Sequence, residues 1–140
     1  MDYLGTYVSV IMKVLDRIFS GEPPLIYGDG SQVYDFVHVK DVARANILGM
    51  KAECSDLNFN IGAGLPTSIN ELVDILLELT QSDLQPEYLP QEQSFVTYRI
   101  GSTELARDEL GFEAQIPVLD GLRDVVAWRM EERGQATQDT

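Results

Sequence analysis

The sequence has very little cysteine and histidine. Its 140 residues contain one cysteine, Cys54, and one histidine, His38. A single cysteine cannot form an internal disulfide, and one cysteine with one histidine cannot supply the four ligands of a structural zinc site. The composition therefore excludes disulfide and zinc scaffolds, and we expect no metal to be bound.

Basic residues are also scarce, with 10 Lys and Arg against 23 Asp and Glu, a formal net charge of −13. Such a charge repels polyanions at long range, so we expect no nucleic-acid partner. A small anionic ligand is still compatible with it. A few Arg or Lys side chains, or helix N-termini, would have to gather around that ligand.

Long apolar runs are missing as well. No run reaches the roughly 20 residues that a membrane span requires, and the N-terminal MDYLGTYVSV lacks the basic lead of a signal peptide. We therefore expect a cytoplasmic protein without a membrane partner. The 44% of apolar residues suffices for one hydrophobic core. This predicts a single domain over residues 1–134, followed by a frayed tail over 135–140.

Apolar periodicity predicts helices that alternate with strands. The expected helices cover residues 3–20, 42–50, 69–79, 103–110 and 117–134, and the expected strands cover 25–27, 33–39, 57–61, 85–89 and 95–100. Asp41 is expected to cap the second helix, and Ser68 to Glu71 has the S-x-x-E form of a capping box. Gly111 is the expected end of the fourth helix. Interleaved helices and strands predict an α/β or α+β fold.

Two blocks of the sequence are similar to a known family. Residues 21–43, GEPPLIYGDGSQVYDFVHVKDVA, resemble the G-x-P-x-x-x-x-G-D-G-x-Q-x-R-D-F-x-x-V-x-D-V-A segment of NAD-dependent sugar epimerases and dehydratases, which are extended short-chain dehydrogenases/reductases. The second block comprises N-I-G-A-G at 60–64, E-L-G-F at 109–112 and G-L-x-x-x-x-x-W at 121–128. The resemblance extends from about Gly5 to Arg129. It implies the small mixed αβ, C-terminal substrate-binding lobe of a UDP-glucose 4-epimerase-like protein, without the N-terminal Rossmann part.

Two motifs of that family are absent from the 140 residues. No G-x-x-G-x-x-G turn for NAD pyrophosphate is present, and none of the six tyrosines is followed four residues later by lysine. We therefore expect no catalytic residues and no cofactor in this chain, although full-length members use NAD, and we expect these residues alone to be inactive. The Gly62–Thr67 loop lacks the third glycine of a dinucleotide-binding turn. We interpret it as a tight strand-to-helix connection.

The resemblance also assigns a candidate binding site for a nucleotide-diphosphate sugar. The strand Leu25, Ile26 and Tyr27 would present its backbone and an aromatic face to the nucleotide base, although Tyr27 as an ordinary core or interface residue is an equal alternative. Tyr34 stands where the family pattern has a diphosphate-binding arginine, which predicts weaker or reorganised phosphate binding. Gln32 is a candidate donor to phosphate or ribose. Arg99 is the nearest guanidinium that could read a phosphate, with an exposed surface role as the alternative.

His38 is predicted to share a strand face with Tyr34 and Phe36, whereas Asp35 points to the opposite face. A His–Asp dyad within the strand is therefore not expected. We interpret His38 as a hydrogen-bonded structural residue.

Three functional hypotheses remain open at this point. The chain is a nucleotide-sugar-binding domain, or a subunit that completes an epimerase or dehydratase with a separate Rossmann-domain chain, or a non-catalytic interaction or regulatory module. Separation from a Rossmann partner would leave apolar surface uncovered, which predicts a homo-oligomer. The first helix, with Tyr3, Tyr7, Ile11 and Val14, is the expected contact surface.

Overall fold

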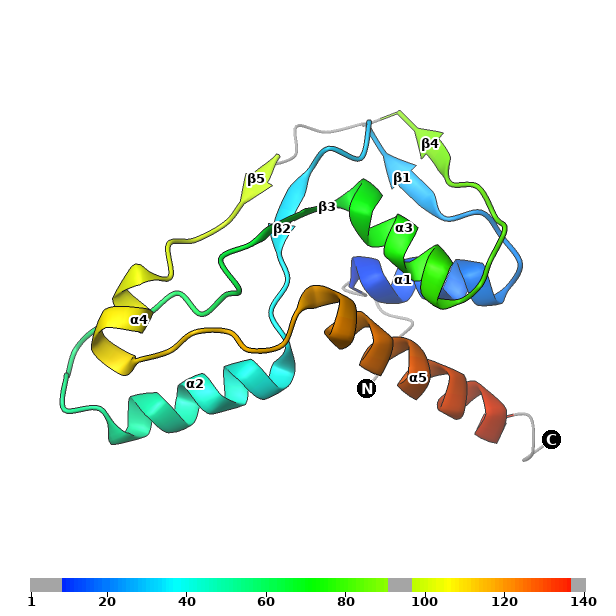
Figure 1. Ribbon diagram of the computed structural model, residues 1–140. Coiled ribbons are helices and arrows are strands. Elements are labelled where there is room, and N and C mark those ends of the chain that lie inside the picture. The colour runs from blue at the N-terminus through cyan, green and yellow to red at the C-terminus, as the bar shows by residue number, and fades with distance from the viewer. Residues whose placement is uncertain (1–8, 91–96, 137–140) are drawn as a thin grey trace. The chain divides into compact units, whose positions relative to one another are not determined.

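The computed structural model describes residues 9–90 and 97–136, which group into two compact units (Figure 1). The first unit comprises residues 9–31, 68–90 and 122–136, and the second comprises 32–67 and 97–121. The chain passes between the units several times, so neither is a continuous segment. A single domain over 1–134 stays a prediction.

The first unit combines helices with one pair of strands. It contains α1 (Val10–Phe19), α3 (Ile69–Leu79) and most of α5 (Val118–Ala136). Strand β1 (Leu25–Tyr27) pairs in parallel with β4 (Glu87–Leu89), and α1 packs against α3. Its core is formed by apolar side chains from the three helices and from β1, namely Met12, Val14, Leu15, Ile18, Ile26, Leu72, Val73, Leu76, Leu122 and Val126.

The capping box predicted before α3 is confirmed. The Ser68 hydroxyl accepts a hydrogen bond from the Glu71 N–H at 3.1 Å, and the Glu71 carboxylate accepts one from the Ser68 N–H at 2.7 Å. This exchange satisfies two backbone donors at the helix start. The described part of the first predicted helix begins at Val10, and residues 3–8 lie outside the described part of the chain. Helix α5 continues to Ala136, two residues beyond its predicted end at Gly134.

The second unit contains two helices and a small sheet. Helix α2 (Val39–Lys51) lies beside α4 (Glu104–Leu110), and the three-stranded sheet has the order β3 (Pro66–Ser68), β2 (Val33–Asp35), β5 (Tyr98–Arg99). Helix α4 ends at Gly111, whose φ of 63° allows the left-handed cap that the sequence predicted. The core groups Ala45, Ala106 and Phe112 with the partly buried Leu48, Phe59, Ile61, Leu110 and Ala114.

Three local predictions are wrong. Residues 57–61 form no strand, because Phe59 and Ile61 pack into the core of the second unit without a partner strand. The predicted strand over 33–39 ends at Asp35, because His38 caps α2: its Nδ1 accepts a hydrogen bond from the Lys40 N–H at 3.2 Å. Asp41 therefore lies inside the first turn of α2 and does not cap it.

The fold class is nevertheless confirmed as mixed α/β. Strands β1 and β2 flank the predicted turn, but each pairs in parallel with a strand from later in the chain, β4 and β5 respectively. Within the described ranges, no helix is long and apolar enough to cross a bilayer.

Candidate functional site

Strand β1 in the first unit carries the three residues expected to receive a nucleotide base. Leu25 is half-buried, Ile26 is 1% exposed and Tyr27 is 52% exposed. The three pair in register with Glu87, Tyr88 and Leu89 of β4, respectively. Ile26 therefore anchors the strand in the core, while the Tyr27 ring lies at the surface of the unit. An exposed ring at a strand end is a suitable stacking face for a base.

The Gly28–Ser31 turn after β1 is fixed by α3. Asn70 donates from its N–H to the Gly30 carbonyl at 3.1 Å and from Nδ2 to the Asp29 carbonyl at 2.9 Å. Gly30 has a φ of 74°, and a Cβ there would lie 1.9 Å from Asn70 Oδ1, so only glycine fits. Within the turn, hydrogen bonds from the Ser31 hydroxyl and N–H lower the pKa of Asp29. The G-D-G sequence is thus a fixed turn with a charged carboxylate.

In the second unit, the fold brings Tyr34 and Arg99 together. Strand β2 pairs in parallel with β5 so that Tyr34 lies opposite Arg99. The Arg99 guanidinium carbon is 5.9 Å from the centroid of the Tyr34 ring, within the range of a cation–π contact. The Tyr34 ring also contacts Phe36, with 6.0 Å between centroids. Gln32, one residue before β2, is buried at 7% exposure.

The glycine-rich loop over residues 62–64 is closed by an internal carboxylate. Asp35 accepts hydrogen bonds from the Ala63 N–H at 2.8 Å and from the Gly64 N–H at 3.0 Å. A Cβ at Gly62 would lie 2.1 Å from Asp35 Oδ2. The donors that could cradle a phosphate are therefore already bonded to a negative group, so these residues do not fit the pyrophosphate of NAD. The geometry supports a tight connection over a phosphate-binding turn.

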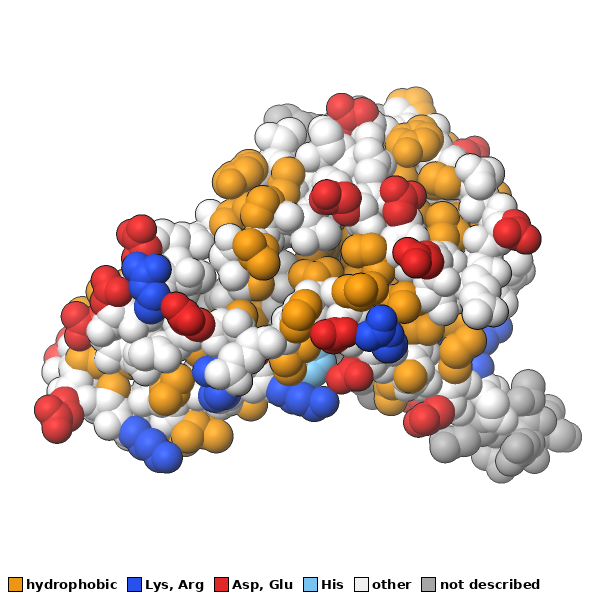
Figure 2. All heavy atoms as spheres, in the orientation of Figure 1, with side chains coloured by type: hydrophobic (Ala, Val, Ile, Leu, Met, Phe, Trp, Pro, Cys, Tyr) orange, Lys and Arg blue, Asp and Glu red, His pale blue; other side chains and the backbone are white. Residues whose placement is uncertain are grey.

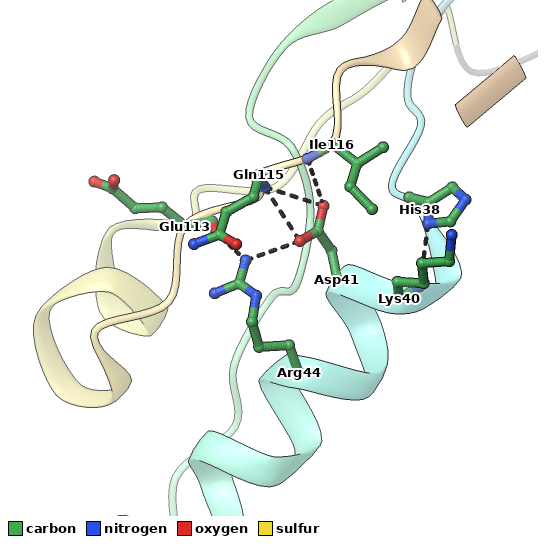
Figure 3. Close-up of polar contacts among 7 residues, drawn as sticks. All are labelled: His38, Lys40, Asp41, Arg44, Glu113, Gln115 and Ile116. Carbon is green, nitrogen blue, oxygen red and sulfur yellow. Dashed lines mark hydrogen bonds and ion pairs between the residues drawn. The ribbon is translucent and has the colours of Figure 1, made fainter. Parts of the chain in front are cut away.

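A second carboxylate, Asp41, forms the centre of a buried polar cluster in the same unit (Figure 3). Its side chain is 2% exposed and accepts hydrogen bonds from the N–H groups of Gln115 and Ile116 at 3.0–3.1 Å, and from Arg44 Nη2 at 2.8 Å. Arg44 also donates to the Glu113 carbonyl, and its guanidinium covers the Phe112 ring. The cluster thus ties the 112–116 connection to α2.

These contacts shift the ionisation of Asp41. Burial alone would raise the pKa of this carboxyl. Hydrogen bonds from Arg44 and from the backbone of Ile116 and Gln115 outweigh the burial, so its pKa lies below the usual 3.8. Because the contacts described for the cluster all lie inside the second unit, the cluster acts as a structural clamp. The sequence analysis missed both Asp35 and Asp41 as clamps, although each belongs to the family-like segment 21–43, and that membership was the available signal.

Acidic side chains are spread over the molecular face in Figure 2, among few basic ones. In the described part of the chain, ion pairs join Arg17 with Glu22, Arg44 with Asp41, Arg107 with Asp108, and Arg129 with Asp16 and Glu132. Arg99, 5.9 Å from the Tyr34 ring centroid, forms no ion pair with a described carboxylate. Within the described ranges, no group of three or more His, Cys, Asp or Glu residues could hold a metal ion.

Comparisons with known proteins assign the chain to a class. The family model of the NAD dependent epimerase/dehydratase family matches residues 3–62. The resemblance predicted from the sequence is therefore confirmed. The chain is a relative of this family of extended short-chain dehydrogenases/reductases, and it spans part of the length of its members.

Individual relatives agree with that assignment. A putative UDP-glucose 4-epimerase of Methanocaldococcus jannaschii is 34% identical over 119 residues, which are 85% of this chain and 38% of the relative. The crystal structure of the Thermotoga maritima UDP-glucose 4-epimerase with UDP-glucose matches with a TM-score of 0.85 and 34% identity, over 94% of this chain and 42% of that one. The UDP-N-acetylglucosamine 4-epimerase of Methanobrevibacter ruminantium, in complex with UDP-N-acetylmuramic acid, matches with a TM-score of 0.83 and 31% identity over the same shares. The chain thus spans about two fifths of the relatives it matches.

Proposed function

We propose that this chain binds a nucleotide-diphosphate sugar and that its 140 residues carry out no epimerase or dehydratase chemistry by themselves. One observation carries the proposal: 94% of the chain matches the fold of part of an epimerase structure that contains UDP-glucose. The absence of a Tyr-x-x-x-Lys pair from the sequence supports the second half, because a tyrosine base at neutral pH needs a nearby fixed positive charge. NAD binding is not proposed for these residues, since Asp35 occupies the donors of the glycine-rich loop.

Each unit carries its own candidate contacts. In the first unit, the exposed Tyr27 ring is a candidate to stack on a base, with backbone groups of Leu25 and the buried Ile26 beside it. In the second unit, taken by itself, the exposed Arg99 is a candidate to bind phosphate. Gln32 is buried just before β2. Its proposed role is to support this strand and to donate a hydrogen bond to phosphate or ribose at the start of the strand.

A binding titration tests the proposal. UDP-glucose, UDP-N-acetylglucosamine and dTDP-glucose would be added to the full chain at up to millimolar concentration, with glucose alone as the control. At about ten times its Kd, a ligand that binds only the folded state stabilises it by about 1.4 kcal/mol, which thermal unfolding detects. Unchanged melting temperature and unchanged amide NMR shifts with all three sugar nucleotides would contradict the proposal. That result would favour the interaction or regulatory module.

The outer face of α2 favours a second candidate function, a subunit that docks onto a separate NAD-binding chain of the epimerase family. Val39, Ala43, Ile47 and Met50 follow one another at three- and four-residue steps along this helix. All four are exposed, Val39 at 73% and Met50 at 79%. An apolar helix stripe of this kind marks a surface for another polypeptide. The occupant we infer is the portion of an epimerase-family chain that these residues do not span.

The first helix offers less surface than predicted for self-association. Val14 is 3% exposed and Ile11 is half-buried, because both pack within the first unit. Tyr3 and Tyr7 lie outside the described residues. A homo-oligomer therefore stays a prediction, and Ile11 and Val14 offer little surface for it.

Co-purification tests the docking candidate. The tagged chain would be co-expressed with the NAD-binding portion of an epimerase-family relative, and capture of that portion is expected. Met50→Glu should abolish capture by placing a charge in the apolar stripe, whereas Ser55→Glu, on an exposed loop of the same unit, should not. Equal capture by both variants would exclude α2 as the docking surface.

A further inference from the structure

The Tyr34–Arg99 pair differs from the arginine contacts that include a carboxylate. Arg17, Arg44, Arg107 and Arg129 each have a carboxylate within 3.2 Å, so their charges are neutralised internally. Arg99 is exposed and has no ion pair with any described carboxylate, despite a net charge of −13. No described carboxylate therefore competes with an external anion for this guanidinium.

The Tyr34 ring restricts the position of the Arg99 guanidinium. The register of β2 and β5 sets the two residues opposite each other, and the guanidinium carbon lies 5.9 Å from the ring centroid. The Tyr34 ring is half-buried and contacts Phe36, with 6.0 Å between centroids, so the ring itself is supported. A planar guanidinium packed on an aromatic face loses part of its rotational freedom and keeps its N–H edge for hydrogen bonding.

We propose that Tyr34 is a positioning residue that holds the Arg99 guanidinium as the diphosphate-binding cation of this chain. This inference rests on the proposed binding of a nucleotide-diphosphate sugar. Tyr34 contributes its ring face, and its hydroxyl is not required. The charge that binds phosphate therefore comes from β5, while β2 supplies the surface that orients it.

Four variants test the inference, with UDP-glucose, uridine and inorganic pyrophosphate as the probes. Arg99→Gln should weaken UDP-glucose binding about tenfold and leave uridine binding unchanged, because uridine has no phosphate. Tyr34→Phe should bind like the wild type, whereas Tyr34→Leu should lose about threefold. Arg107→Gln removes an exposed arginine of the same unit that is already paired with Asp108, and it should have no effect.

A double variant tests where the phosphate binds. Tyr34→Arg combined with Arg99→Gln moves the guanidinium to the neighbouring strand, opposite its original position, and it should recover UDP-glucose affinity to within about threefold of the wild type. No recovery would contradict a phosphate site beside the β2–β5 pair.

The outcomes distinguish this inference from the proposed function. If the wild type binds UDP-glucose and Arg99→Gln binds it equally well, the inference is wrong while the proposed function stands. If the wild type binds pyrophosphate through Arg99 but no sugar nucleotide, the proposed function is wrong and the anion site stands. Binding of neither ligand would overturn both.

Discussion

The buried carboxylate of Asp41, which joins α2 to the 112–116 connection, is predicted to contribute strongly to the free energy of unfolding. We consider Asp41→Asn, which keeps the size of the side chain and removes its charge. The carboxylate accepts from Gln115 N–H, Ile116 N–H and Arg44 Nη2. The amide of asparagine keeps one acceptor oxygen, and its NH₂ group would face donors. At least one of the three donors therefore loses its partner.

The magnitude follows from burial and charge. A hydrogen bond to a charged group contributes about 1.5–3 kcal/mol, and an unpaired buried donor costs about 1–3 kcal/mol more. Asp41 is 2% exposed, so water cannot replace the lost contacts. We expect Asp41→Asn to lower the free energy of unfolding by about 3 kcal/mol, a large fraction of the roughly 5–15 kcal/mol typical of a folded domain. Glu109→Gln, on the exposed side of α4, should stay within about 0.5 kcal/mol.

Two measurements check this difference. Urea unfolding followed by circular dichroism gives the global change for both variants. Hydrogen exchange at the amides of Gln115 and Ile116 gives the local change at the clamp, which lies inside one of the two units. Faster exchange at these two amides is expected in Asp41→Asn alone. Equal stability of the two variants, with unchanged exchange at 115 and 116, would refute the clamp.

Three further predictions follow from other contacts. The folded-state pKa of the Asp41 carboxyl is lowered from 3.8, so the charged carboxylate stabilises the fold above that pH, and this stabilisation is lost as the pH falls below about 4. The free energy of unfolding of Asp41→Asn should therefore decrease less than that of the wild type over this pH range. Gly62→Ala should lower the free energy of unfolding, measured by thermal unfolding, by about 1–3 kcal/mol, because its Cβ would lie 2.1 Å from Asp35 Oδ2. Gly49→Ala, inside α2 where the Cβ meets open space, should raise it by about 0.5–1 kcal/mol. Ser68→Ala removes the cap of α3 and should lower the free energy of urea unfolding by about 1 kcal/mol; an unchanged midpoint would contradict the role of the cap.

Local sequence signals predicted the elements whose causes are themselves local. The start of α3 was correct because Ser68 and Glu71 satisfy each other's backbone within one turn. The end of α4 was correct because Gly111 accepts a positive φ. In both cases the residues that decide the structure lie next to each other in the chain.

The errors occurred where a distant partner decides the structure. Leu57, Phe59 and Ile61 alternate as in a strand, but a strand needs a partner strand, and Phe59 and Ile61 join the core of the second unit without one. Asp41 near a helix start has the local signature of a cap, yet its partners Gln115 and Ile116 lie 74 and 75 residues away. Local pattern cannot distinguish a cap from a clamp of this kind.

The candidate site likewise combines residues that the sequence identifies with a contact that only the folded chain creates. The sequence identified Tyr34 as a departure from the family pattern and Arg99 as the nearest guanidinium, but it gave no reason for the two to meet. The parallel pairing of β2 and β5 supplies that reason. Net charge is also a poor guide to a candidate anion site, because four arginines in the described ranges pair with the chain's own carboxylates, and the acidic total does not describe the surroundings of Arg99. A guanidinium group without a carboxylate partner, packed against an aromatic ring by a strand pair, can therefore offer an anion a local positive charge in a strongly acidic protein.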